Sequence, residues 1–297
     1  MSERTRVIAV FVTLTALWGT TWSAIRIVLQ GIPPLAGVSL RFVLAGLVLL
    51  GWSRWRGVRF QWNAIEWRLW SVNALLSFMG SYGLVYWAEQ RVPSGLASVI
   101  FATFPLWVTL LGRWFLPEEK GSSSQYLGVA LGFTGTAILF SENLELELGP
   151  GALAAAVALL VAPLLSAIAS LSMKRWGKGV SPESLSAMPM LLGGLALAPI
   201  SALTEQGRVW GSAPGPWLAT VYLAIFGSAL TFPLYFWLLA RRSAVSASLV
   251  SYTAPVIAVV IGIVAFEERM TTRLAAGALC VLSGVAWALR PVRRAAS

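Results

Sequence analysis

The side chains that most often carry out chemistry in proteins are scarce in this sequence. It contains no His and one Cys, and its 12 acidic residues are all Glu, each at or near the end of an apolar run. Metal-assisted hydrolysis, general acid–base pairs, and Cys or Ser nucleophiles activated by His therefore lack their parts. We expect no catalytic residue, no metal site and no cofactor.

Hydroxyl groups and aromatic rings are the remaining functional groups in the middle of the apolar runs. Aromatic rings supply shape and stacking, and hydroxyls orient a polar group of a ligand. Small hydroxyls also join membrane helices without touching a ligand, so packing is the alternative for each Ser. We predict a central substrate cavity lined by Tyr82, Ser98, Phe101, Ser248, Ser251 and Tyr252.

Three residues of the first two apolar runs extend this candidate site. Trp18 and Trp22 lie one helical turn apart, and they either face the cavity or pack between helices. Arg41 is a cation inside an apolar run. It is a candidate gate or partner for a substrate carboxylate, and the alternative is a structural arginine whose charge reaches the membrane interface.

Two prolines, Pro105 and Pro255, stand in the middle of apolar runs that resemble each other. Neither can donate the usual helical hydrogen bond, so the carbonyls of Phe101 and Ser251 lose their partner. Such carbonyls are tolerated in a bilayer mainly where the helix lines a protein-enclosed or wet cavity. We predict that both prolines are hinges, and a kink satisfied by a neighbouring helix is the alternative.

The elements that carry these residues are membrane spans. The chain is 57% apolar and 11% charged, with a mean hydropathy of +0.75, far from the composition of a soluble domain. At about 20 residues per span, we predict ten transmembrane helices in a single transmembrane domain, 1–297. The apolar runs cover 7–29, 35–52, 69–88, 94–116, 125–141, 151–173, 183–203, 216–239, 244–266 and 273–289.

The chain also repeats itself at an offset of 150 residues. Identical pairs between the two copies are Leu84/Leu234, Trp87/Trp237, Arg91/Arg241, Ala97/Ala247, Ser98/Ser248, Thr103/Thr253 and Pro105/Pro255. Several matches in register indicate a duplicated unit. We place the internal repeats at 6–147 and 148–294, and because each holds five spans the second copy must enter the membrane from the opposite side.

The basic residues predict the orientation. If the amino terminus is cytoplasmic, the outside connections hold Arg91, Arg208, Arg269 and Arg273, and the inside connections hold many more Lys and Arg. This asymmetry places both termini in the cytoplasm. It also explains the net charge of +10 without a nucleic-acid partner. We expect a multi-pass protein of the plasma membrane, the bacterial inner membrane.

Several motifs resemble the drug/metabolite transporter superfamily, in its ten-helix EamA-type branch. The residues that carry the resemblance are Trp18 and Gly19, Arg41 and Phe42, and the endings FLPEEKGSSSQYLGVALGFTG and FEERMTTRLAAGALCVLSG of the two halves. The aromatic-rich centre is similar to that of amino-acid exporters of the YddG type. The resemblance implies an all-α membrane protein built from two inverted five-helix repeats.

Inverted halves are typical of carriers that work by alternating access and bind substrate near the midplane. We therefore predict an alternating-access carrier. We further predict that it is a facilitated exporter of neutral, aromatic or hydrophobic amino acids. The alternatives within transport are other small metabolites or lipophilic drugs, with or without proton coupling. A membrane enzyme and a scaffold are the alternatives outside it. The expected partners are a small-molecule substrate and the lipid bilayer, and the sequence makes no prediction about oligomeric state.

Overall fold

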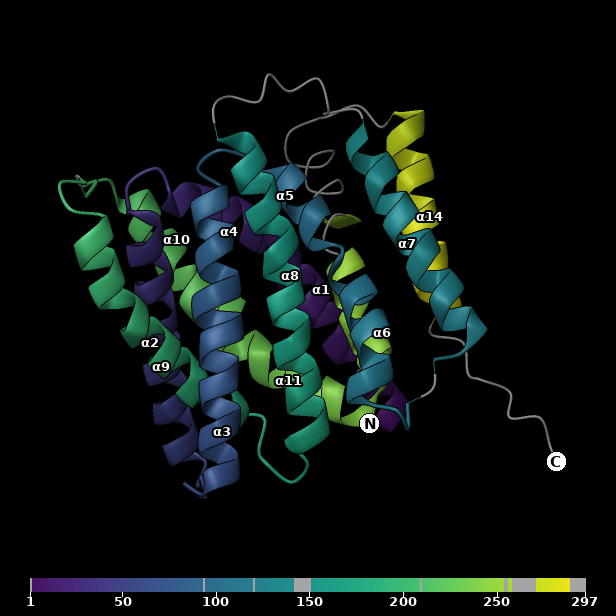
Figure 1. The fold of residues 1–297 in the computed structure, drawn as a ribbon, viewed down its shortest axis with the longest axis horizontal. Coiled ribbons are helices and arrows are strands. Elements are labelled where there is room, and N and C mark those ends of the chain that lie inside the picture. The colour runs from purple at the N-terminus through teal and green to yellow at the C-terminus, as the bar shows by residue number, and fades with distance from the viewer. Residues whose placement is uncertain are drawn as a thin grey trace.

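A computed structural model describes residues 2–92, 94–119, 121–141, 151–208, 210–253, 256–257 and 271–288 (Figure 1). Within these ranges the chain forms helices and turns and no strand. Six stretches of the described chain are long and apolar enough to cross a membrane, and they include Leu96–Phe115 and Pro214–Arg241, which each join consecutive helices. The all-α membrane class is confirmed.

The helices follow the ten predicted spans in order. They are α1 (Glu3–Val28), α2 (Pro34–Trp55), α3 (Ala64–Asn73) with η1 (Ala74–Ser81) and α4 (Tyr82–Ala88), α5 (Ser94–Phe101) with α6 (Phe104–Phe115), α7 (Ser123–Ser141), α8 (Ala152–Trp176), α9 (Ser184–Thr204), α10 (Pro214–Ala224) with η2 (Ile225–Leu230) and α11 (Thr231–Arg241), α12 (Ala244–Ser248), and α14 (Thr272–Ala288). Of the predicted ninth span, 244–266, most residues lie outside the described part of the chain.

The spans run between two faces of the bundle. The amino-terminal face holds Ser2 and the ends of α2, α6, α8 and α11, and the far face holds the ends of α1, α4 and α9. A backbone bond from Gly211 N to Gly31 O, 2.7 Å long, joins two connections at the far face. Helix α1 starts at the amino-terminal face, whereas α8 starts at the far face, where Gly151 lies beside Arg91. The two halves are therefore inverted.

Two π-helical segments mark equivalent positions of the two halves. Segment η1, Ala74–Ser81, shifted by 150 residues becomes 224–231, which is the region of η2, Ile225–Leu230. A π segment adds residues to a helical turn, and such segments concentrate at functional sites. Here they widen the middle of the third and eighth spans, and no local sequence pattern predicts either segment.

Helices of opposite halves pack closely through glycines. A Cβ on Gly46 of α2 would come within 2.9 Å of the backbone of α9, and one on Gly128 of α7 within 2.5 Å of α14. Small residues allow membrane helices to approach each other in this way. The pairs α2–α9 and α7–α14 thus join the halves, and α7 and α14 lie side by side at the right of Figure 1.

The fourth span is broken next to its proline. Helix α5 ends at Phe101, Ala102 and Thr103 form a turn, and α6 starts at Phe104. Pro105 occupies the first turn of α6, where a missing N–H is least disruptive. A break in this position is what a hinge requires, although hinge motion at Pro105 stays a prediction. Pro255 lies outside the described residues.

Candidate substrate site

A central cavity of about 90 Å³ lies between the two halves. Helices α1, α3, α4, α5, α6, α8 and α11 contribute to it, together with η1 and the beginning of the ninth span. Its lining residues are Trp18, Thr21, Trp22, Ile25, Asn73, Ser77, Tyr82, Val85, Ser98, Phe101, Phe104, Ser166, Ser170, Phe232, Tyr235, Phe236 and Ser251. None of these lining residues carries a formal charge at neutral pH, so the cavity suits a ligand with no net charge.

Aromatic rings from both halves line the central cavity. The ring of Trp18 lies 5.7 Å from that of Phe232 and 5.4 Å from that of Tyr235, centroid to centroid. Trp22 meets Phe101 edge to face at 5.6 Å. Aromatic rings packed in this way stabilise one another, and they present apolar surface to a flat apolar group of a ligand.

Hydroxyl groups supply the polar part of the lining. Ser166 Oγ donates to Ser81 Oγ at 2.8 Å, and Ser251 Oγ donates to the Ser248 carbonyl at 2.9 Å. Because these protons are used within the protein, the oxygen lone pairs are what such hydroxyls offer to a ligand. The indole nitrogen of Trp18 is complementary to them. It is buried and has no hydrogen-bond partner in the described structure.

The central cavity brings together six of the nine predicted substrate residues: Trp18, Trp22, Tyr82, Ser98, Phe101 and Ser251. Ser248 does not line it, since it is 1% exposed and its Oγ donates to the Val245 carbonyl. Tyr252 also lies elsewhere. Its ring packs against Gly132 of α7, and its Oη donates to the Val129 carbonyl at 3.0 Å.

The prediction that Tyr252 faces the cavity therefore needs correction, and helical geometry gives the reason. Consecutive residues of a helix point about 100° apart, so Ser251 and Tyr252 do not share a face. In the structure Ser251 lines the cavity, and Tyr252 is buried in a second apolar cluster with Val129 and Val281.

Arg41 lies behind the cavity wall. Its guanidinium carbon is 4.9 Å from the centroid of the Tyr82 ring. Its Nε donates to Ser228 Oγ at 2.8 Å and Nη2 to the Gly227 carbonyl at 3.2 Å, both in η2. At 1% exposed, Arg41 ties α2 to the π segment and reaches the cavity through the Tyr82 ring, which it supports by a cation–π contact. Direct contact with a substrate carboxylate is not available to it in this conformation.

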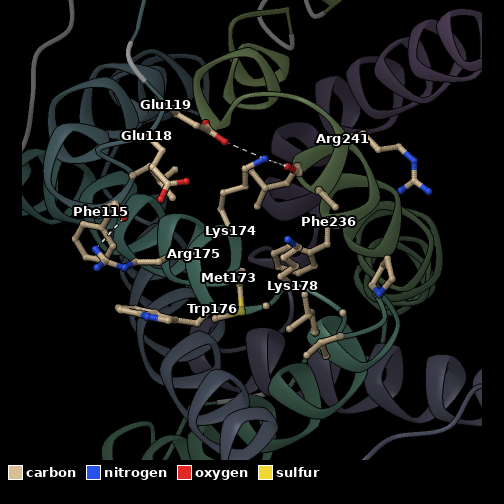
Figure 2. Close-up of a pocket in the computed structure, with 18 of the residues that line it drawn as sticks. Phe115, Glu118, Glu119, Met173, Lys174, Arg175, Trp176, Lys178, Phe236 and Arg241 are labelled. Atoms are coloured by element: carbon tan, nitrogen blue, oxygen red, sulfur yellow. Dashed lines mark hydrogen bonds and ion pairs between the residues drawn. The ribbon is translucent and has the colours of Figure 1, made fainter.

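A vestibule of about 670 Å³ lies at the amino-terminal face. Basic side chains from Lys174, Arg175, Lys178 and Arg241 line it with the carboxylates of Glu118 and Glu119. Arg175 and Trp176 border one side and Arg241 the other, with Phe236 between them (Figure 2). Phe236 lines both the vestibule and the central cavity. The Phe236 side chain therefore borders both spaces.

Comparison with known proteins identifies this architecture. Residues 5–141 and 153–290 each match the EamA-like transporter family. The chain belongs to this family. Two matches in one chain agree with the duplication seen in the sequence and in the paired π segments.

Relatives of this EamA-like transporter cover most of its length. Protein PagO of Salmonella typhimurium (strain LT2) is 32% identical over 253 residues, 84% of this chain and 81% of PagO. The uncharacterized inner membrane transporter YedA of Escherichia coli (strain K12) is 31% identical over 255 residues, 84% and 79% of the two chains. A crystal structure with 23% identity has the same fold, at a TM-score of 0.79 over 97% of both chains. The protein is a multi-pass membrane transporter.

An ion pair fixes the joint between α11 and α12 of the EamA-like transporter. Lys174 Nζ lies 3.1 Å from Glu119 Oε1 and donates to the carbonyls of Leu239 and Arg242 at 2.7 and 2.8 Å. Glu119 Oε2 accepts from Ala244 N at 2.9 Å. The Lys174 cation thus binds backbone carbonyls at the carboxyl end of α11, and the Glu119 carboxylate binds a backbone N–H at the amino end of α12. Helix dipoles favour both placements. Figure 2 shows this pair at the wall of the vestibule.

Phe232 and Phe236 are cavity residues that sequence reasoning missed. A signal for Phe232 was present, because it occupies the position of Tyr82 in the second repeat, 150 residues later. Phe236 carries no such signal. Its position between the two spaces follows from the packing of α11 alone.

Proposed function

We propose that this EamA-like transporter exports neutral amino acids with aromatic or hydrophobic side chains by alternating access. The observation that carries the proposal is the lining of the central cavity, whose described residues combine aromatic rings and hydroxyls from both halves without a charged side chain. A phosphorylated metabolite needs fixed cations to replace its water. An isolated organic cation needs a carboxylate. A zwitterion needs neither, because its charges compensate each other.

The groups in the cavity match the three parts of such a substrate. The Trp18 indole N–H, which has no acceptor among the described residues, is a donor for the carboxylate. Oxygen lone pairs of Ser166 and Ser251 are acceptors for the ammonium group. The rings of Trp22 and Phe101 accommodate the side chain, with loose selectivity because apolar packing discriminates weakly between similar shapes.

The cavity must widen before a substrate enters. Ligand sites commonly enclose about 300–1,000 Å³, whereas the central cavity encloses about 90 Å³. The vestibule, at about 670 Å³, is already large enough and adjoins the cavity at Phe236. Displacement of Phe236 would join the two spaces. With both termini in the cytoplasm, as the basic residues favour, the vestibule is the cytoplasmic entrance, through which a substrate for export would enter.

The test is flux in proteoliposomes made with purified protein. We expect exchange of labelled phenylalanine or leucine, and no exchange of glucose 6-phosphate. An imposed pH gradient alone should not drive accumulation against a concentration gradient, since the cavity lining holds no carboxylate or His to carry a proton. Robust flux of a sugar phosphate or a lipophilic cation, with none for any neutral amino acid, contradicts the proposal.

The uncharged aromatic lining also suits neutral lipophilic drugs, and this is the second candidate function. The same vesicles distinguish the two. Competition of labelled phenylalanine by excess unlabelled amino acid, but not by an ester that lacks the carboxylate, supports amino acids. Equal competition by both compounds supports the drug carrier.

A further inference from the structure

Glu89 is a buried carboxylate outside the central cavity and the vestibule. It follows α4 in the turn at the far face and is 9% exposed. Its Oε2 accepts one hydrogen bond, from Ser94 Oγ at 2.8 Å. Its Oε1 is buried and has no hydrogen-bond partner in the described part of the protein. An unpaired buried oxygen is uncommon in native structures and calls for an explanation.

Two other Glu residues at the ends of spans have hydrogen bonds to both oxygens of their carboxyl groups. Glu66 is 2% exposed and accepts from Gln61 N, Trp62 N and Ser184 Oγ through its two oxygens. Glu205 accepts from Leu35 N, Ala36 N and Ser201 Oγ, again with both oxygens used. Each of these two carboxyl groups therefore accepts three hydrogen bonds. Among the described residues Glu89 has a single neutral donor, which is the environment of a protonated acid.

The charged groups that face Glu89 do not replace the missing donors. Arg26 of α1 and Arg41 of α2 act on it at a distance, Tyr86 of α4 lies near it, and none of them forms an ion pair or hydrogen bond with it in the described structure. Arg41 is already held by Ser228 and Gly227. Burial raises the pKa of the Glu89 carboxyl above its ordinary value, against the smaller opposing effects of Ser94 and the two arginines.

We propose that Glu89 is a proton-binding site that keeps the far face closed while the proton is bound. In this conformation the Glu89 carboxyl group is buried away from water at the far face. Burial costs a neutral acid much less free energy than it costs a carboxylate. When the far face opens, water reaches Glu89 and can stabilise its ionised form. Bound proton and closed far face therefore stabilise each other, by reciprocal linkage.

The direction of the pH effect follows from this linkage. The pKa is raised in the closed conformation relative to the water-exposed one. Proton binding thus stabilises the closed conformation fully when the pH is below the ordinary pKa of Glu. This stabilisation is lost as the pH rises through the raised pKa of the closed conformation. We expect alkaline pH at the far face to favour its opening. In this proposal the proton controls access to the substrate site from the far face and does not drive transport. This consequence for transport rests on the proposed function as an exporter.

The direct experiment needs no substrate. Infrared spectra of the reconstituted protein should show the C=O stretch of a protonated carboxylic acid at neutral pH, a band that ionised carboxylates lack. Glu89→Gln should remove the band, whereas the matched exposed variant Glu118→Gln should keep it. Absence of the band in the unmodified protein, or its persistence in Glu89→Gln, overturns the proposal whether or not amino acids are the substrate.

A second variant guards against misfolding of Glu89→Gln. Ser94→Ala leaves the carboxyl group in place and removes its donor, so the midpoint of the infrared band should rise by about one pH unit. An unchanged midpoint contradicts the site. In transport, the exchange rate of the unmodified protein should depend on the pH at the far face, and that dependence should disappear in Glu89→Gln. A rate with the same pH dependence in both proteins also contradicts the proposal.

Discussion

Tyr82 and Phe232 occupy the same position of the two repeats and meet across the central cavity, edge to face, with ring centroids 6.0 Å apart. Residues related by an inverted repeat meet where the two halves share their local symmetry axis. The cavity therefore lies at that axis, where alternating-access carriers place their substrate. A second related pair shows the inversion itself, because Arg91 stacks on Trp87 and Arg241 on Trp237, at 4.3 and 4.2 Å, near opposite faces.

The first prediction concerns the rings of the cavity. Phe101→Ala should reduce the exchange rate at low substrate concentration by about tenfold, because one ring contact is worth about 1.5 kcal/mol. Trp55→Ala is the control, since Trp55 is 73% exposed and far from the lining. Radiotracer exchange in proteoliposomes measures both. Equal losses in the two variants would indicate general destabilisation in place of a site.

The second prediction concerns Phe236 as the separation between vestibule and cavity. In a Cys280→Ser background, Ser170→Cys should react slowly with a small thiol reagent supplied at the amino-terminal face. Adding Phe236→Ala should speed the reaction severalfold, because Phe236 borders both spaces. Phe115→Ala, which enlarges the vestibule alone, should not. Equal reaction rates with and without the Phe236 ring rule out this role.

The third prediction concerns the joint between α11 and α12. Lys174→Met should lower the free energy of unfolding by about 1–3 kcal/mol, because it leaves two carbonyls at the end of α11 without their donor. Lys178→Met removes an exposed vestibule lysine and should change stability by less than about 0.5 kcal/mol. Chemical denaturation in detergent micelles compares them. Similar values for both lysines would show that the joint contributes no special stability.

The fourth prediction concerns orientation in the membrane. With both termini cytoplasmic, Gln206→Cys at the far face should be labelled by an impermeant thiol reagent in intact cells, and Ser2→Cys should be protected. Both variants again use the Cys280→Ser background, and permeabilised cells provide full labelling as the reference. The opposite pattern reverses the assignment of both faces.

Much of this transporter is determined locally and is therefore readable in the sequence. Each span is long and apolar because its backbone must satisfy its own hydrogen bonds in lipid, and the helices begin and end near the predicted residues. The duplication predicted the inverted halves, since an odd number of spans reverses the second copy. The composition alone limits the chemistry, because the chain has no His or Asp and its Glu residues stand at span ends.

Tertiary packing decided which side chains reach the cavity. Ser251 and Tyr252 are equally plausible in sequence, yet the rotation of one helix sends Ser251 to the cavity and Tyr252 against Gly132. Arg41 turns away from the cavity because η2 offers Ser228 and the Gly227 carbonyl as partners, and nothing local predicts a π segment there. The same holds for Glu89. Its residue type and place in the chain resemble those of Glu66 and Glu205, but in the described structure the nearby donors leave one of its oxygens without a hydrogen bond.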